Sequence, residues 1–270
     1  MPRQIANAHT TFNVANTLLF IGFAPLFARL AERLVPDRPL EEKIIIEPRY
    51  LDADVIEIPA MALEQVRFEI GHMGEIINQM FLSLRSAVRE KDKQKAAVVK
   101  FENKVGILSA AILQYLREVR QQPLTDKQSE RFQALMSATV NLESLADILN
   151  DEMYDIAMGF IEMKAEPSEA TRLLVQNLTD KVGHAVDQVV QAVREEDERA
   201  AEEVIALKED IHQIAEEFLL RQSERLGVVD EGHLNLVRLE MELLDKLRSI
   251  YTLAKRIARD FVPEEVASKA

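Results

Sequence analysis

Two Glu-x-x-His pairs are the residues in this sequence whose types and spacing most directly suggest chemistry. Glu69 with His72, and Glu209 with His212, each place a carboxylate and an imidazole one helical turn apart. Di-iron carboxylate proteins use this spacing, but their two pairs face each other inside one bundle. Here the pairs fall in different halves of the chain, and 46 acidic residues make such a pair easy to find by chance. We therefore do not expect a di-iron site.

Catalytic motifs are missing from the sequence. There is no Cys, so thiol nucleophiles, disulfides and thiolate metal sites are excluded. Gly-rich phosphate loops, G-x-S-x-G and H-E-x-x-H are also absent. His184 and His233 have no convergent partners in the sequence, and we expect them on the surface. These features predict an interaction or regulatory protein rather than an enzyme.

The composition indicates helices and excludes one class of partner. A chain of 270 residues that is 47% hydrophobic can bury a core, and eight Gly with no Trp favour long helices over sheets. The net charge of −13 argues against nucleic-acid binding, which requires clustered Lys and Arg. Residues 1–38 carry four Arg and two acids, a net charge of +2, whereas the remainder carries 29 bases and 44 acids, a net charge of −15. This asymmetry suggests two environments, one apolar and mildly basic and the other soluble and acidic.

Proline positions and apolar spacing predict six helices. Between Ala60 and Val262 the only prolines are Pro123 and Pro167, which we expect in turns. Thr125 with Gln128 reads as a capping box, Ser168 as an N-cap and Gly227 as a C-cap. Apolar residues recur in alternating steps of three and four, which is the seam of a helical bundle. The expected helices span 60–91, 93–120, 126–163, 169–195, 197–226 and 231–261.

An internal repeat divides these helices into two sets of three. AVREKDKQKAAVVKFENKVGIL at 87–108 echoes AVREEDERAAEEVIALKEDIHQI at 192–214. Each copy ends one helix, turns through charged residues and begins the next apolar stripe. A duplicated three-helix unit follows, in which we expect each half to bury the stripes of its own helices.

The N-terminal region contains one charge-free apolar segment. No charged residue lies between Arg3 and Arg29, and Phe12 to Ala28 approaches the length of about 20 residues needed to cross a bilayer. A membrane helix, a signal peptide and a buried helix of a soluble protein are the alternatives. If the segment spans, the arginines that follow it place the acidic region on the cytoplasmic side of the inner membrane.

Two stretches of the sequence resemble a known family. RQIANAHTTFNVANTLLF at 3–20 and PRYLDADVIEIPAMALEQVRFEIGHMGEI at 48–76 are similar to the end of the membrane region, the linker and the first cytoplasmic helix of bacterial sodium-phosphate cotransporters. The resemblance implies a last transmembrane helix at 1–35, a linker at 36–59, and a PhoU-like domain at 60–262. It further implies two three-helix bundles, at about 60–163 and 168–262, and a tail at 263–270.

The resemblance also implies how transport would work. Gln4, Asn7, His9 and Asn13 fall in the transporter-like run, where polar residues would lie near the transport path. Full-length relatives have several membrane helices before this point, between which sodium and phosphate would bind. A single helix cannot enclose such a site. We therefore expect no transport from this chain alone, and other membrane helices as partners, from a longer reading frame or a separate subunit.

PhoU proteins carry acidic metal-binding motifs, and the match to them here is partial. Glu102 matches the first acid of one motif, but Gly106 stands where Asp is expected. Glu143 and Asp147 match the other motif, and carboxylates one turn apart suit divalent cations. In the second half the same positions hold Lys208, His212, Asp245 and Ser249, so a divalent metal or iron is conceivable only in the first bundle. The alternative is that Glu143 and Asp147 are simply solvated.

Three functions follow from these observations. The leading hypothesis is the C-terminal portion of a sodium-dependent phosphate transport protein, with a cytoplasmic PhoU-like domain that modulates phosphate uptake or homeostasis. The second is a soluble PhoU-type regulator that acts on a separate transporter or sensor kinase and forms a homodimer. The third is a metal-dependent helical bundle. No cofactor is expected apart from that metal.

Overall fold

The computed structural model describes Phe12 and residues 47–93, 104–163, 167–226 and 231–267. The chain divides into two units, Met1–Ile45 and Ile46–Ala270, and all described residues except Phe12 belong to the second. The predicted membrane segment after Phe12, and the linker up to residue 46, lie outside the described residues. Within these ranges, no helix combines the length and apolar character needed to cross a bilayer.

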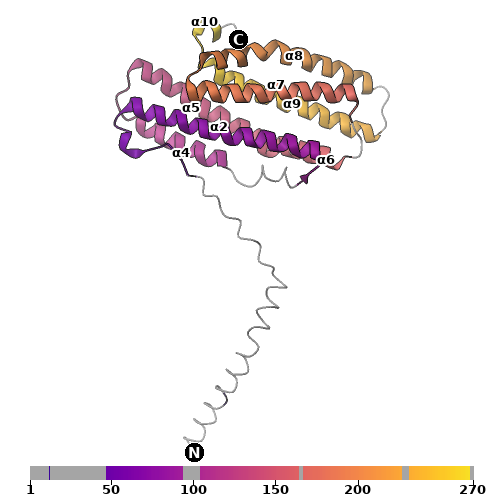
Figure 1. Ribbon diagram of the computed structural model, residues 1–270, viewed down its shortest axis with the longest axis horizontal. Helices are drawn as coiled ribbons and strands as arrows, with labels where there is room; N and C mark the ends of the chain where they lie inside the picture. The colour runs from indigo at the N-terminus through magenta and orange to yellow at the C-terminus, as the bar shows by residue number, and fades with distance from the viewer. Residues whose placement is uncertain (1–11, 13–46, 94–103, 164–166, 227–230, 268–270) are drawn as a thin grey trace, which may run out of the picture. The chain divides into compact units, whose positions relative to one another are not determined.

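The second unit is all-α, as predicted, and no strand occurs in its described part (Figure 1). The helix boundaries agree with the predicted ones to within three residues wherever both ends are described. Two short elements were not predicted, the 3₁₀ turn η1 and the helix α10 in the expected tail. In chain order the elements are η1 (Ala53–Val55), α2 (Pro59–Glu90), α4 (Lys104–Val119), α5 (Asp126–Asp147), η2 (Ile148–Met153), α6 (Tyr154–Glu162), α7 (Glu169–Glu195), α8 (Glu198–Leu226), α9 (Glu231–Arg259) and α10 (Glu264–Ala267).

Local sequence signals account for where these helices begin. Pro59 occupies the first turn of α2. The N–H groups of a first turn have no acceptor within the helix, so proline, which lacks this group, costs no hydrogen bond there. The capping box at α5 is confirmed, since the Thr125 hydroxyl accepts from the Gln128 N–H and the Gln128 side chain accepts from the Thr125 N–H. Ser168 caps α7 by accepting from the Thr171 N–H at 3.2 Å. The predicted C-cap Gly227 lies outside the described residues.

The internal repeat is visible in how α2 and α7 end. Lys91 and Glu196 occupy equivalent positions of the two copies, and both adopt a left-handed backbone, with φ of 51° and 52° and ψ of 40°. The next residues, Asp92 and Asp197, donate their N–H groups to the carbonyls of Ala87 and Ala192. Left-handed C-caps usually employ Gly. Two non-glycine residues with the same strained geometry therefore support a duplicated unit.

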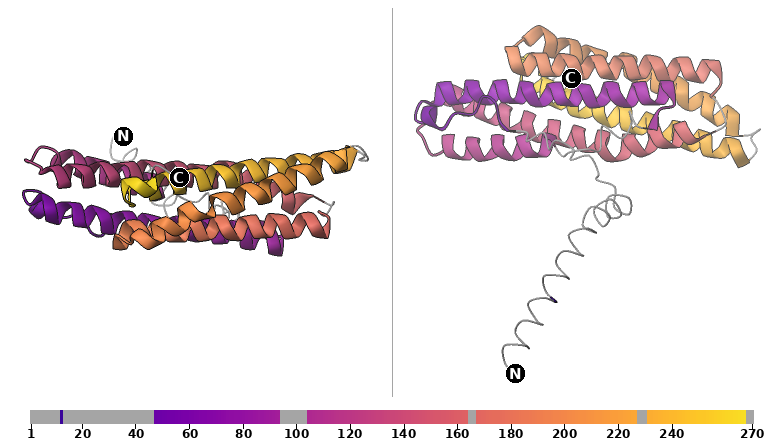
Figure 2. Two further views of the ribbon diagram at one scale, coloured as in Figure 1. Left: turned by 90° about the horizontal axis from the view of Figure 1, so that it is seen from above. Right: turned by 60° about the horizontal axis from the view of Figure 1, so that its bottom comes forward.

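The two halves do not bury separate cores. The first half (α2, α4, α5, η2 and α6) and the second half (α7, α8 and α9) run roughly along one axis, and α2 packs on α7 as extensively as on α5 (Figure 2). Side chains of both halves join one buried cluster. The helices of each half pack on one another, as expected, and the core shared between the halves is an additional feature that the sequence did not predict. Burial of a large aliphatic side chain contributes about 1.5–3 kcal/mol, so the shared core stabilises both halves together.

Small residues allow α2 and α7 to approach closely. A Cβ added to Gly74 would lie 2.5 Å from both Cγ atoms of Val190, and one added to Gly71 would lie 2.7 Å from Cδ of Arg194. Contacts this short do not occur between real carbon atoms. The absence of side chains at these two positions therefore sets the distance between the halves.

The helix predicted at 126–163 is interrupted by one wide turn. Residues Ile148–Met153 form the π-helix η2, which joins α5 to α6. A π turn contains more residues than an α turn, so it rotates the apolar face of the segment that follows. The following helix, α6, packs against both α2 and α9 and so contacts both halves. The three-four spacing of apolar residues did not reveal this turn.

Candidate functional site

A buried carboxylate holds the end of the linker on the bundle. Glu69 of α2 has no exposed surface. Its Oε2 accepts the N–H groups of Arg49 and Tyr50 at 2.7 and 2.8 Å, and its Oε1 lies 2.8 Å from Nδ1 of His72. Hydrogen bonds to a buried charged group are stronger than neutral ones, and each contributes about 1.5–3 kcal/mol. We call Glu69, His72, Arg49 and Tyr50 the linker anchor.

A second attachment lies further along the same segment. The Tyr115 hydroxyl of α4 lies 2.8 Å from the carbonyl oxygen of Asp52 and 2.9 Å from Oε1 of Gln65. The same Gln65 oxygen accepts the Asp52 N–H at 2.9 Å. Burial, together with the nearby carboxylates of Asp52 and Glu118, raises the pKa of Tyr115. The hydroxyl therefore stays protonated and available as a donor. Residues 49–52 thus run back along α2 and are held at both ends.

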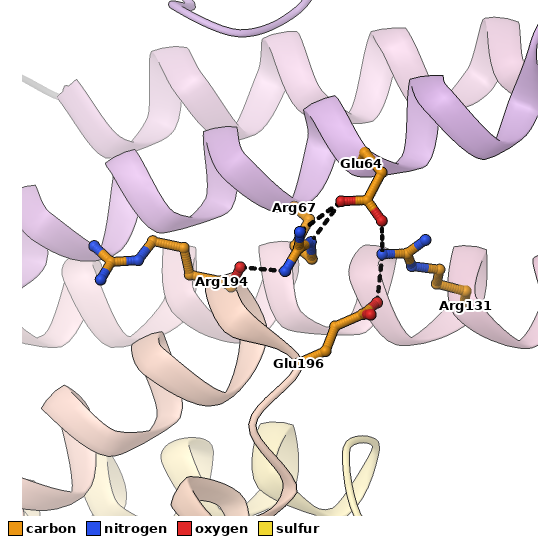
Figure 3. A network of polar contacts seen from close by, with 5 residues as sticks. All are labelled: Glu64, Arg67, Arg131, Arg194 and Glu196. Carbon is orange, nitrogen blue, oxygen red and sulfur yellow. Dashed lines mark hydrogen bonds and ion pairs between the residues drawn. The ribbon is translucent and has the colours of Figure 1, made fainter.

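A charged network joins the two halves beside this segment (Figure 3). Glu64 of α2 lies 2.5 Å from both Arg67 and Arg131. Arg131 of α5 also pairs with Glu196, the left-handed residue that ends α7. Arg67 donates to the carbonyl of Arg194 in the last turn of α7. Three helices from both halves therefore meet at five residues, which we call the junction network.

The charges of the junction network stabilise one another. Burial alone would raise the pKa of Glu64, but hydrogen bonds from Arg131 and Arg67 outweigh that effect and hold the pKa below its ordinary value. Glu64 is partly exposed, so solvent weakens each pair, although a network loses less than an isolated pair does. The network therefore fixes the register of α2 against α7.

Arg67 connects the junction network to the linker anchor. Its guanidinium lies 4.7 Å from the centre of the Phe68 ring, which in turn lies 5.8 Å from the Tyr50 ring. Tyr50 is the anchored residue that donates to Glu69. A change in the packing of the halves would therefore reach the linker through directly contacting side chains. This arrangement can transmit force or position, and it contains no nucleophile with an activating base.

The predicted metal residues are placed only in part. Glu143 of α5 accepts a hydrogen bond from Ser109 of α4 at 2.6 Å, and Asp147 lies one turn further along. Burial raises the pKa of Asp147, and the neighbouring carboxylates of Glu143 and Asp151 raise it further. Glu102 lies outside the described residues. Within the described part of the chain, no group of three His, Cys, Asp or Glu side chains could hold a metal. The metal site at Glu102, Glu143 and Asp147 stays a prediction.

The remaining predicted residues are the polar residues of the transporter-like run and the histidines of the helical body. Gln4, Asn7, His9 and Asn13 lie outside the described residues. Of the two Glu-x-x-His pairs, only Glu69 and His72 touch each other, whereas the recorded partner of His212 is Glu216, at 3.3 Å on the surface. His184, expected on the surface, is half exposed and lies 3.6 Å from Glu203.

Sequence reasoning noticed Glu69 but missed its role. A signal was present, because Glu69 lies at a seam position of α2 between the buried residues Val66 and Met73. Charged residues are almost never fully buried unless they are paired. A similar signal marks Glu240 of α9, which is buried and bonded to Gln222 at 2.7 Å and Arg225 at 2.6 Å. A carboxylate within an apolar stripe therefore predicts a hydrogen-bonding partner from another segment of the chain.

The fold and the comparisons define the class of protein. The chain has an all-α PhoU-like fold: the crystal structure of PhoU from Pseudomonas aeruginosa superposes with a TM-score of 0.67 at 15% identity, covering 74% of this chain and 94% of PhoU. In sequence, the chain is 28% identical over 149 residues to “Putative inorganic phosphate export protein YjbB” of Salmonella typhimurium and 25% identical to that of Escherichia coli K12. The match covers 55% of this chain and 27% of each relative, so the chain spans about a quarter of their length. No model of a known protein family matches the chain.

Proposed function

We propose that this chain is the regulatory portion of a phosphate transport protein and contributes to phosphate homeostasis. The observation that carries the proposal is the sequence match to the YjbB proteins, whose name describes inorganic phosphate export. The PhoU-like fold supports it independently. The relatives are much longer than the match, which leaves room in them for a transport region that this chain does not supply.

In this proposal the helical body acts on transport through the linker. The apolar run at Phe12–Ala28 is the last membrane helix, and the helical body lies on the cytoplasmic side of the inner membrane. The linker anchor attaches the helical body, residues 59–267, to the chain that leads to the membrane through the hydrogen bonds of Glu69. The junction network connects the linker anchor to the packing of the two halves. A signal that shifts the halves would thereby move the linker and alter phosphate movement.

Three finer parts belong to the same proposal. Coupling to sodium rests on the resemblance at residues 3–20 alone. A non-enzymatic role is supported by the absence of catalytic motifs from the sequence. The partners are other membrane helices, with phosphate and sodium bound only by the complete transporter.

Phosphate flux in intact cells tests the proposal. Bacteria that make the complete transporter would be loaded with radioactive phosphate, with this chain present in the transporter as the wild type, as its Glu69→Ala variant, or as a control Glu202→Gln variant on the exposed face of α8. A further strain would make the transporter without this chain. We expect the chain and the control to change the rate of phosphate efflux or uptake, and the anchor variant to lose most of that effect. If phosphate flux is the same with and without the chain, the proposal is wrong.

A soluble PhoU-type regulator is the second candidate. The observation in its favour is that the chain covers 94% of a PhoU chain in a structural superposition. Fractionation separates the two candidates. Retention of the tagged chain in membranes after high-salt and alkaline washes supports the transporter portion. Release of the whole chain by salt, together with a homodimer by light scattering, supports the separate regulator.

A further inference from the structure

We propose that the surface formed by Asp54, Glu57, Ile58 and Met61 binds a basic amphipathic helix on the cytoplasmic side of a membrane transport protein. We call these four residues the docking face. The inference rests on the proposed function for the location of the partner. It adds a defined surface and the chemistry of what binds there.

The docking face exposes apolar side chains at helical spacing. Ile58, the residue before α2, and Met61, one turn later, are each 51% exposed. Phe68 continues the stripe two turns further on and is 41% exposed. Three large apolar side chains in one line along a helix match the contact pattern of a helix that packs across them.

The surroundings of these side chains are acidic. Residues 50–66 contain Asp52, Asp54, Glu57 and Glu64 and no basic residue. Glu64 is neutralised by Arg67 and Arg131 in the junction network. Among the described residues, neither Asp54 nor Glu57 forms an ion pair. Apolar side chains therefore lie beside two uncompensated carboxylates, which is the complement of a helix with one apolar and one Lys- or Arg-rich edge.

The backbone of the docking face is held in place before any partner binds. The Asp52 carboxylate accepts the Asp54 N–H at 2.9 Å and so caps η1. Gln65 and Tyr115 hold the same turn from α2 and α4. A preorganised surface loses less conformational entropy on binding than a disordered segment.

A neighbouring hollow extends the surface at the end of α4. Its volume is about 480 Å³, and it begins beside Ile56 in the segment between η1 and α2. In Figure 1 this segment, drawn in indigo, lies at the end of the bundle where α2 begins. The hollow offers amide groups and one charge of each sign, Arg117 and Glu118, to the flank of a bound helix, so it adds no net charge to the docking face. It is lined by Ile56, Gln114, Arg117, Glu118, Gln121 and Gln122.

The charge of the docking face selects among partners. Anionic lipid headgroups and nucleic acids would be repelled by Asp54 and Glu57. A second copy related by a two-fold axis through this face would bring the carboxylates of both copies into one interface without adding a basic residue of the docking face. Cytoplasmic edges of membrane proteins are enriched in Lys and Arg, and they lie where the linker leads. A basic amphipathic helix of the transport region is the partner that matches both the exposed apolar side chains and the two carboxylates of the docking face.

The test measures binding of the full chain to a synthetic helical peptide of about 18 residues, with leucines on one face and lysines on the other. A peptide of the same composition in scrambled order, and vesicles of phosphatidylglycerol, are compared. Two double variants remove the docking face, Ile58→Ser with Met61→Ser and Asp54→Lys with Glu57→Lys. Two matched controls on α8 are Leu219→Ser with Leu220→Ser, and Glu202→Lys with Glu209→Lys. Circular dichroism verifies that every variant is folded.

We expect each docking-face variant to weaken binding of the helical peptide about tenfold or more, while each control changes it less than about twofold. The scrambled peptide should bind wild-type protein several times more weakly than the helical one. Equal losses in the controls, or unchanged binding in the docking-face variants, would overturn the proposal. So would vesicle binding that depends on these residues while peptide binding does not. None of these outcomes depends on phosphate flux, so this proposal and the proposed function can fail separately.

Discussion

The two halves of the helical body share a backbone plan but use their buried polar groups for different contacts. In the first half, Glu69 and Tyr115 bind the linker, which lies outside the three-helix repeat. In the second half, Glu240 binds Gln222 of α8, and the Tyr251 hydroxyl donates to the Val204 carbonyl, so these contacts stay within the half. The duplicated scaffold therefore supplies stability in both copies, and among the described residues the hydrogen bonds that hold the linker come from the first copy.

The exposed faces of the halves also differ in charge. The carboxylates of Glu143 and Asp151 add to burial in raising the pKa of Asp147 in the first half. In the second half, burial lowers the pKa of Lys255, and Lys208 and Arg259 lower it further. A cation would therefore be attracted to one face and an anion to the other.

The largest expected loss of stability comes from removing either of the two buried carboxylates, Glu69 or Glu240, and hydrogen exchange distinguishes their roles. Glu69→Ala removes the acceptor of the Arg49 and Tyr50 amides, and Glu240→Ala removes the acceptor of the Gln222 and Arg225 side chains. We expect each variant to lower the free energy of unfolding by about 2–3 kcal/mol in urea denaturation. Only Glu69→Ala should speed hydrogen exchange at the amides of Arg49 and Tyr50. If Glu240→Ala speeds exchange at those amides equally, the linker is not held specifically by the first half.

The next effect tests the contact between the halves. Gly74→Ala inserts a methyl group against the β-branched Val190 and should cost about 1–3 kcal/mol. Gly71→Ala meets Cδ, Cγ and Cβ of Arg194 at 2.7, 2.8 and 3.3 Å. The outer part of this side chain can shift and helix propensity favours Ala, so we expect a smaller loss than for Gly74→Ala. Thermal unfolding of both variants provides the measurement. A smaller loss for Gly74→Ala than for Gly71→Ala would contradict the close packing of α2 on α7.

A third effect tests the equivalence of the repeat. At Lys91 and Glu196 the change to Gly should relieve the left-handed backbone, whereas the change to Ala removes the side chain and keeps the strain. We expect the Gly variant to be more stable than the Ala variant by about 1 kcal/mol at each position. The Gly and Ala variants both lack the original side chain, so the loss of its contacts, including the Glu196–Arg131 pair, cancels when the two variants are compared. The difference in stability between Gly and Ala should therefore be the same at Lys91 and at Glu196. Unequal differences would mean that the copies are not equivalent here.

The smallest effect concerns the acidic face and pH. The pKa of Asp147 is raised above its ordinary value of 3.8 in the folded protein, so the folded state binds the proton more tightly than the unfolded state. The contribution of Asp147 to stability is therefore most favourable below that value and declines as the pH rises through the folded pKa. Asp147→Asn should stabilise the protein slightly at neutral pH and have little effect in acid.

Urea unfolding at neutral and acidic pH measures this difference, with the exposed Glu202→Gln as the control. The control should change stability equally at both values of pH. Greater stabilisation by Asp147→Asn in acid than at neutral pH would show that burial and the neighbouring carboxylates do not raise the pKa of Asp147.

The helices, their caps and the duplication could be predicted from the amino-acid sequence alone. Apolar spacing and the capping residues Thr125 and Ser168 act within a few residues, so they could be read directly. The resemblance to phosphate transport proteins likewise came from short runs of the sequence. The three-dimensional structure was needed to show that α2 packs on α7 in a shared core, that η2 interrupts the helix predicted at 126–163, and that Glu69 binds residues 49 and 50. These features depend on contacts between segments far apart in the chain or on side chains from several helices, and the periodicity of a single helix contains no information about which neighbour will satisfy it.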